Sequence, residues 1–161
     1  MPDPDFPQLD LDAQLCFPLY AATRALTRRY SALLAEAGLT YPQYLCLLAL
    51  WEHGRAAVPL TVSGLGARLR LDSGTLTPVL KRMEAAGLLT RRRDAADERR
   101  VLVELSAAGW ALRARVADVP GRLVEGLSFA PEEAERLRAL LGRLLEDLDN
   151  APAPGRGSAQ D

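Results

Sequence analysis

Apolar residues recur at three- and four-residue spacing over most of the chain, which is the spacing of one face of an amphipathic helix. Between residues 90 and 105 the spacing shortens to two, which is typical of half-buried strands. The helical spacing then returns and continues to residue 148, with an interruption at Pro120-Gly121. The helices that this pattern predicts lie within residues 11–37, 40–53, 60–70, 71–89 and 107–148. The sequence therefore predicts a mainly α chain with a small β-wing.

The stretch from Leu71 to Leu89 predicts a helix with two chemically different sides. Asp72 and Ser73 are residue types that cap helix N-termini, and Gly87 supplies a left-handed stop. One side is apolar and carries Leu76, Val79, Leu80 and Met83. The other side carries groups that can contact base edges or phosphates, namely Ser73, Thr75, Thr77, Lys81 and Arg82. Taken alone, the same pattern also fits an amphipathic surface helix with a solvated polar side.

The segments on either side of this helix complete a known motif. Residues 60–70 predict a short extended segment and then a short helix capped by Thr61, and two short helices joined by a tight turn form a helix-turn-helix. Residues 90–105 predict two strands around the polar turn Asp94–Glu98, with Val101, Val103 and Leu105 on one face. Arginines at positions 91, 92, 93, 99 and 100 make this hairpin a basic wing. We therefore expect a winged helix-turn-helix, with its recognition helix in the major groove and its wing along the backbone or minor groove.

The distribution of charge agrees with this motif, although the net charge of −1 does not indicate it. Residues 1–15 hold four acidic and no basic side chains. Residues 68–100 hold nine basic and five acidic side chains, a local charge of +4, whereas residues 130–161 hold four and seven, or −3. A basic centre between acidic ends is expected of a DNA-binding module in a mildly acidic protein.

Length and cysteine content narrow the class of protein. A chain of 161 residues is long enough for one core of ordinary size, and no apolar run reaches the roughly 18 residues of a membrane span. The acidic, proline-bearing N-terminus is unlike a signal peptide. Two cysteines are too few for a disulfide framework, so we expect a cytoplasmic protein without a membrane partner. The sequence contains no phosphate-binding glycine loop or metal-ligand cluster, so no cofactor is expected.

The expected organisation is one domain between two loose ends. Residues 1–10 are expected to be flexible, residues 11–149 to form the single domain, and residues 150–161 to be a disordered tail by composition. The winged helix-turn-helix occupies about residues 60–105 of that domain.

The terminal helices, over about residues 11–37 and 107–148, carry more leucine than one core of this size can bury. A two-fold homodimer joined through these helices would cover the leucine stripes. Pro18 is awkward in the first helix, because a helix begun near Asp12 would lose the amide that bonds the carbonyl of Gln14. The regular helix therefore either begins later than the pattern suggests or is kinked near Pro18.

The region from Leu60 to Gly109 resembles the MarR family of winged-helix regulators, and its Asp97-x-Arg99 pair matches the wing motif of that family. A narrower resemblance, to the organic hydroperoxide resistance (OhrR) branch, extends from Leu11 to Leu148. It rests on four blocks in register: LDAQLCFPLY, GLTYPQYLCLLALWE, LDSGTLTPVLKRMEAAGLLTR and DVPG. The resemblance implies a repressor, not an enzyme, that binds palindromic double-stranded DNA. Arg99 is expected to position the wing through Asp97 or to reach the minor groove.

The same resemblance implies a redox switch. Cys16 matches the cysteine that organic hydroperoxides oxidise in this branch, and Tyr30 and Tyr41 match the tyrosines that hold it. Oxidation would release the DNA, and a small thiol can cap the oxidised sulfur as a mixed disulfide. No cysteine follows Cys46, so the chain resembles the one-cysteine type, and Cys46 is expected to serve packing. Gly64 stands where the branch often has a glutamate that would complete a capping box.

Helix geometry places a condition on this switch. Cys16 and Tyr30 are 14 residues apart, which is about 21 Å along one helix and within about 40° of the same face. The two side chains therefore cannot touch within one subunit, but they can meet where two such helices cross antiparallel in a dimer. A phenol hydroxyl that donates to sulfur would stabilise the reactive thiolate.

Two other classes of function remain open at this point. The first is a regulator of the same fold that is gated by a small aromatic or phenolic ligand, with Cys16 incidental. The second is a thiol enzyme in which Cys16 is the peroxidatic nucleophile. The second is disfavoured, because the sequence has neither a Cys-x-x-Cys motif nor a thioredoxin-like alternation of strands and helices.

Overall fold

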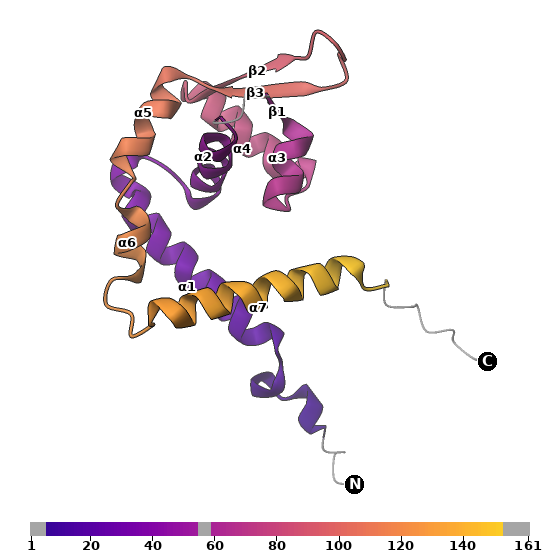
Figure 1. Cartoon of the computed structure of the whole chain (residues 1–161), viewed down its shortest axis with the longest axis vertical. Coiled ribbons are helices and arrows are strands. Elements are labelled where there is room, and N and C mark those ends of the chain that lie inside the picture. The colour runs from indigo at the N-terminus through magenta and orange to yellow at the C-terminus, as the bar shows by residue number, and fades with distance from the viewer. Residues whose placement is uncertain (1–5, 55–58, 153–161) are drawn as a thin grey trace, which may run out of the picture. The chain divides into compact units, whose positions relative to one another are not determined.

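The computed structural model describes residues 6–54 and 59–152 of the chain. The elements in chain order are the 3-10 helices η1 (Pro7–Leu9) and η2 (Leu11–Ala13), α1 (Cys16–Leu34), the 3-10 helix η3 (Ala35–Ala37), α2 (Tyr41–His53), β1 (Leu60–Thr61), α3 (Val62–Leu69), α4 (Ser73–Ala85), β2 (Leu89–Arg93), β3 (Val101–Leu105), α5 (Ala107–Arg115), α6 (Val119–Val124) and α7 (Pro131–Asn150). The fold is therefore mainly α with a small antiparallel sheet, as the sequence predicts (Figure 1).

The first long helix begins at Cys16, later than the apolar pattern suggests. Pro18 is its third residue, and the amides of the first turn have no intrahelical partner, so the proline ring removes no hydrogen bond there. The prediction of a helix over residues 11–37 is thus wrong at both ends, because residues 11–13 and 35–37 form separate 3-10 turns. Gly38, with φ of 68°, ends the segment in the left-handed conformation.

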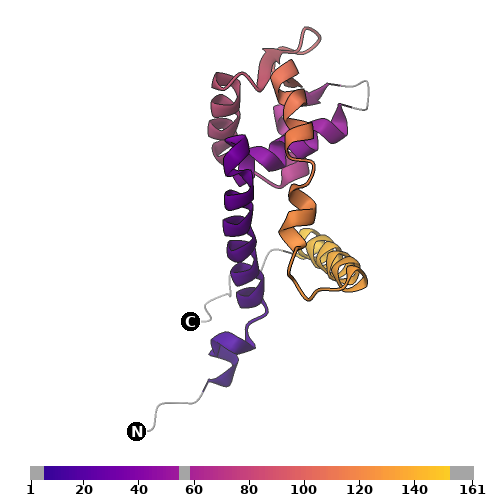
Figure 2. The same ribbon diagram turned by 90° about the vertical axis from the view of Figure 1, so that its left-hand side faces the viewer.

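The core gathers around α2, which α3, α4, α5 and the end of α1 surround (Figure 2). Gln43 caps the start of α2, since its Oε1 accepts a hydrogen bond from the amide of Thr40 at 2.9 Å. The largest fully buried side chains include Tyr44, Leu47 and Cys46 on this helix. Both short helices of the helix-turn-helix are capped as predicted, α3 by Thr61 and α4 by Asp72.

The sheet has the strand order β1-β3-β2, with both pairs antiparallel. Leu89 faces Leu105 and Arg93 faces Val101, so β2 and β3 form the predicted hairpin. The alternation predicted for β3 fails at its centre, where Leu102 and Val103 are both buried. Leu102 is buried outside the main core cluster, on the central strand of the sheet.

Close backbone contacts join the wing to the following helix. The Ser106 hydroxyl donates to the carbonyl of Gly87 at 2.6 Å, and the Ser106 amide donates to the carbonyl of Leu88 at 3.1 Å. A Cβ at Gly109 would overlap that same Leu88 carbonyl oxygen. The Trp51 indole donates to the carbonyl of Gly109 at 3.1 Å. Position 109 therefore has room only for glycine.

The C-terminal half departs from the predicted continuous helix over 107–148. The break falls at residues 116–118, earlier than Pro120-Gly121, and Pro120 lies in the first turn of α6, where a proline removes no helical bond. The chain divides into two compact units, one that ends at Leu123 and one that begins at Val124. The single domain predicted over residues 11–149 stays a prediction. Loose ends were predicted at residues 1–10 and 150–161. Of these, residues 1–5 and 153–161 lie outside the described part of the chain.

The terminal helices are largely uncovered in the single chain. No residue of α7 is buried, and only Leu34 is buried in α1. Among the described residues no single helix is both long and apolar enough to cross a membrane, although Cys16–Ala37 and Tyr41–His53 pass that test together as a pair bent by 75°.

Candidate nucleic-acid interface and thiol site

The start of α4 is held by the carboxylate of Asp72. Its Oδ1 accepts the amide of Thr75 at 2.8 Å, and its Oδ2 accepts the Thr75 hydroxyl at 2.9 Å. These bonds, the backbone bond first, lower the pKa of Asp72 below its ordinary value. Asp72 is therefore ionised at neutral pH, and Ser73 is the first helical residue instead of a cap.

The predicted apolar face of α4 is confirmed, because Leu76, Val79, Leu80 and Met83 are all buried. Of the predicted contact residues, Ser73, Thr75, Lys81 and Arg82 are exposed, whereas Thr77 is half-buried. The structure thus leaves the N-terminal turn and the cationic second half of the helix accessible.

Two residues on the accessible face of α4 were not among the contact residues predicted from the sequence. Gly74 and Pro78 are both exposed, and their spacing of four places them on one stripe with Lys81 and Arg82. Pro78 lies inside the helix and has no amide, so the carbonyl of Gly74 lacks its intrahelical donor. The proline in the middle of the pattern was the signal that could have identified this site.

Most arginines of the wing are paired with carboxylates. Arg91 pairs with Glu84 of α4 at 2.6 Å, and this side-chain bond lowers the pKa of Glu84. Arg92 pairs with Glu104 at 2.7 Å and Arg100 with Asp94 at 3.6 Å, whereas Arg93 donates to the carbonyl of Glu98. Pairing leaves the local net charge of +4 unchanged, because Glu84 and Asp94 are already counted in it, but it holds these guanidinium groups in place.

Arg99 differs from its neighbours because its side chain is 91% exposed although it is paired. Its Nε lies 3.0 Å from Oδ1 of Asp97, and its Nη2 donates to Oδ2 at 3.3 Å. The Arg99 side-chain bond is the main reason why the pKa of Asp97 is lowered. The Asp97-x-Arg99 pair thus orders the tip of the wing and still presents the guanidinium to solvent.

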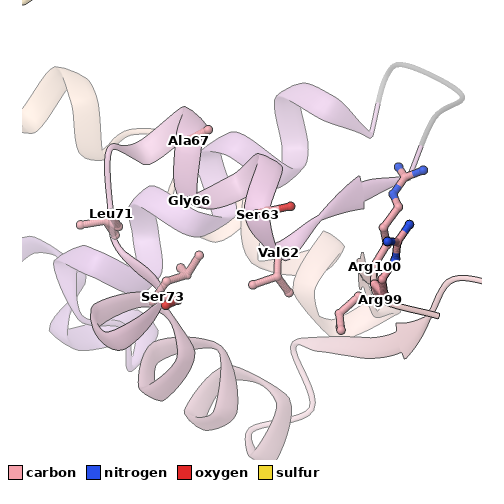
Figure 3. Close-up of a pocket in the computed structure, with 10 residues that line it drawn as sticks. Val62, Ser63, Gly66, Ala67, Leu71, Ser73, Arg99 and Arg100 are labelled. Atoms are coloured by element: carbon pink, nitrogen blue, oxygen red, sulfur yellow. The ribbon is translucent and has the colours of Figure 1, made fainter. Parts of the chain in front are cut away.

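A hollow of about 420 Å³ separates the wing from the start of α4. Ser63 of α3, Ser73 of α4 and Arg99 and Arg100 of the wing line it (Figure 3). Two predicted contact residues, Ser73 and Arg99, which are 26 residues apart in the sequence, therefore line different sides of one hollow.

The two cysteines lie in opposite environments. Cys16 is exposed and is the first residue of α1. Cys46 is fully buried in α2, and burial raises its pKa to about 11. Only Cys16 is therefore placed to react with a molecule in solution.

Tyr30 and Tyr41 form a stacked pair, with ring centroids 4.4 Å apart and an interplanar angle of 19°. Tyr44 lies beside Tyr30 at 5.8 Å. Burial raises the pKa of all three phenols, so they are neutral hydrogen-bond donors at physiological pH. Within one chain the structure does not bring Cys16 to this cluster, because 14 residues of α1, about 21 Å, separate Cys16 from Tyr30.

The chain resembles known transcriptional regulators over most of its length. The family model "Transcriptional regulator SarA/Rot" matches residues 28–113. An organic hydroperoxide resistance transcriptional regulator of Bacillus subtilis is 47% identical over 89% of this chain and 95% of its own length. The HTH-type transcriptional regulator TtmR of Methylorubrum extorquens is 52% identical over 92% of this chain and 72% of its own length.

Solved structures give the same result. Reduced AbfR bound to DNA aligns with a TM-score of 0.73 and 33% identity, over 88% of this chain and 94% of the AbfR chain. A further structure of AbfR, from Staphylococcus epidermidis, aligns with a TM-score of 0.71 and 30% identity over the same shares.

Proposed function

This chain belongs to the MarR family of winged-helix transcriptional regulators, in the branch of the organic hydroperoxide resistance regulators, and we propose that it is a peroxide-sensing repressor. Its relatives are regulators and not enzymes. The proposal has three parts: the chain binds palindromic DNA as a homodimer, organic hydroperoxides oxidise Cys16, and oxidation releases the DNA.

The exposed face of α4 and the wing support the DNA-binding part. Ser73 and Thr75 carry hydroxyls for bases or phosphates, and Lys81 and Arg82 carry cations for phosphates. Thr77 is half-buried and contributes at the edge of this face. Arg99 reaches the adjacent backbone or minor groove, and Asp97 holds it in place.

The uncovered leucines of the terminal helices support the dimer. Leucines are exposed in the single chain on both sides of the core in sequence. These are Leu15 and Leu26 before it and Leu137, Leu140 and Leu148 after it. Isolated exposed leucines are common, but stripes of them on helices at both ends are typical of an oligomer interface. A two-fold dimer would present two copies of α4 to successive major grooves and thereby select a palindrome.

The exposure of Cys16 at the start of α1 is the observation that carries the redox part. Its thiolate attacks the terminal oxygen of a hydroperoxide, so that an S–O bond forms as the O–O bond breaks. The sulfur becomes a sulfenic acid, and the departing alkoxide takes a proton from water and leaves as the alcohol. A small thiol then condenses with the sulfenic acid, which gives a mixed disulfide and water. A neutral or enlarged sulfur no longer accepts the hydrogen bonds that Tyr30 and Tyr41 of the second subunit give a thiolate.

A titration of DNA binding against oxidant tests the proposal. The reduced protein is mixed with a duplex selected for binding, and release is followed as an organic hydroperoxide is added up to one equivalent per thiol. We expect release from the wild type and from Cys46→Ala, which is the matched control because Cys46 is buried. Cys16→Ser should stay bound. Release from Cys16→Ser would reject the redox part and leave the DNA-binding part standing.

One feature favours ligand gating as a second candidate. A pocket of about 260 Å³ lies between α2 and the α5–α6 segment, with aromatic walls and one cation. Its lining includes Tyr44, Leu48, Trp51, Arg113, Val116 and Pro120. Such a site suits a small aromatic anion. In that case a ligand of this type, and not a peroxide, would release Cys16→Ser from DNA.

A further inference from the structure

The hydrogen-bond direction at Thr75 is fixed by its partner. An ionised carboxylate can only accept, so the Thr75 hydroxyl must donate its single hydrogen to Oδ2 of Asp72, 2.9 Å away. The lowered pKa of Asp72 keeps this carboxylate ionised throughout the physiological range. Thr75 Oγ1 is therefore left with lone pairs only, and it meets the solvent as an acceptor.

The side chains next to Thr75 on α4 offer few hydrogen-bond donors. Gly74 has no side chain, and the exposed ring of Pro78, one turn further along α4, has no donor. The nearest cations on the same stripe, Lys81 and Arg82, begin about a turn beyond Pro78. Thr75 is thus an exposed polar side chain whose neighbours Gly74 and Pro78 offer no donor of their own.

Resting on the proposed function, the geometry points to Asp72 as a specificity-determining positioning residue for DNA recognition. Asp72 holds the Thr75 hydroxyl as an acceptor, and Thr75 then selects a base with an exocyclic amino group in the major groove. Adenine N6 and cytosine N4 are such donors, whereas guanine O6 and N7 and thymine O4 are acceptors and are rejected.

The capping role of Asp72 does not account for this arrangement by itself. The cap needs only the bond from the Thr75 amide to Oδ1, and asparagine or serine would supply it about equally well. A carboxylate near DNA is moreover repelled by phosphates. The second bond, to Oδ2, is the contact that distinguishes aspartate from these uncharged caps. Gly74 leaves room for the carboxylate, since a Cβ there would lie only 3.0 Å from its Oδ1.

Asp72→Asn reverses the polarity with almost no change of shape. The asparagine Oδ1 still accepts the Thr75 amide, but its NH₂ group donates to Thr75 Oγ1 and turns the hydroxyl hydrogen outward. We expect one position in each half-site to change from adenine or cytosine toward guanine or thymine. A single hydrogen bond of this kind changes the preference by roughly threefold to tenfold.

The experiment is a selection of bound sequences from a randomised duplex library by the reduced, full-length protein. Its readout is the ratio of bound bases at each position. Asp72→Ser is the matched control, because it loses the same charge and keeps the cap but lets the Thr75 hydroxyl rotate. This variant should lose the preference at that position without reversing it. The uniform gain in affinity from a lost negative charge cancels in the ratio.

The Asp72→Asn change is also made in a Thr75→Val protein, which lacks the hydroxyl at nearly constant side-chain volume. Asp72→Asn should have no effect on base preference when valine stands at 75. Unchanged preferences in Asp72→Asn, or a change that persists with Val at 75, would overturn the inference. A wild-type protein that binds no duplex when reduced would instead overturn the proposed function, and the inference with it. Thermal unfolding of each variant verifies that α4 remains folded.

Discussion

Lys81 is the single lysine of the sequence, and its side chain is exposed in the second half of α4. If it contacts a phosphate, Lys81→Ala should weaken binding to all sequences alike and lower the salt slope by about one unit per protomer. Arg122→Ala on α6 serves as the control, because it removes an exposed cation far from α4 in the sequence, and its slope should not change.

A second measurement follows from the same residue. An amine-reactive label can modify only Lys81 and the N-terminus, so protection of Lys81 by operator DNA reports the contact directly. Equal labelling with and without DNA, together with an unchanged slope, would remove Lys81 from the interface.

The two thiols should differ in reactivity by a large factor. The pKa of Cys46 is raised to about 11 by burial, so at neutral pH this thiol is both protonated and shielded. We expect an alkylating reagent to modify Cys16 in the native protein and Cys46 only after unfolding, as measured by peptide mass. Native labelling of Cys46 at the rate of Cys16 would contradict the burial seen here.

The same raised pKa has a consequence for stability, whose sign follows from linkage. The folded thiol keeps its proton above the pKa of about 9 that an unfolded thiol has. The contribution of the protonated Cys46 thiol to the free energy of unfolding is therefore complete below pH 9, and it is lost as the pH rises through about 11.

The wing should contact DNA through its tip, where Arg99 lies. Arg99 is exposed and its ion pair with Asp97 lies at the surface, so Arg99→Ala should change the unfolding free energy by less than about 1 kcal/mol. We expect it to reduce DNA affinity and to leave the dimer and the oxidation of Cys16 unchanged. Chemical denaturation and a binding titration of the same preparation separate the two effects. A variant that unfolds would show instead that the residue is structural.

The elements that the sequence predicted well are those with local signals. The capping side chains Gln43, Thr61 and Asp72 mark three helix starts, and each makes its expected hydrogen bond. The hairpin follows from alternation and a polar turn. The start of α1 was predicted too early, because Leu11 and Leu15 continue the apolar spacing, although Leu11 lies in a separate 3-10 turn and Leu15 only precedes the helix.

The candidate site was harder to predict from the sequence, because it depends on which side chains lie close together in the folded chain. Counting charges gives a basic wing, but only coordinates show that Arg92 and Arg100 are paired with Glu104 and Asp94. The polarity of the Thr75 hydroxyl likewise depends on a single contact.

The proposed switch belongs to the whole molecule, since Cys16 and Tyr30 lie toward opposite ends of α1 and Tyr41 lies at the start of α2. Tyr30→Phe and Tyr41→Phe should keep DNA binding in the reduced state and slow oxidation, because the thiolate loses a donor from the second subunit. Stopped-flow oxidation and DNA release measure both effects. Tyr44→Phe is the matched control, since it removes a phenol from the same cluster at a buried position. If both variants behave as the wild type, the tyrosines serve interface packing only.

The glycine at position 109 limits how such a signal can travel. Ser106 bonds both Gly87 and Leu88, and the backbone at Gly109 lies against Leu88 with no space between them. The end of α4, the base of the wing and the start of α5 therefore share few internal degrees of freedom and should rotate as one body. In the proposed dimer, oxidation of the thiol should therefore change the angle between the two winged helix-turn-helix units and leave each of them undeformed. The turn at residues 116–118 is the nearest break in the helix that leads away from this body, and we expect the change of angle to occur there.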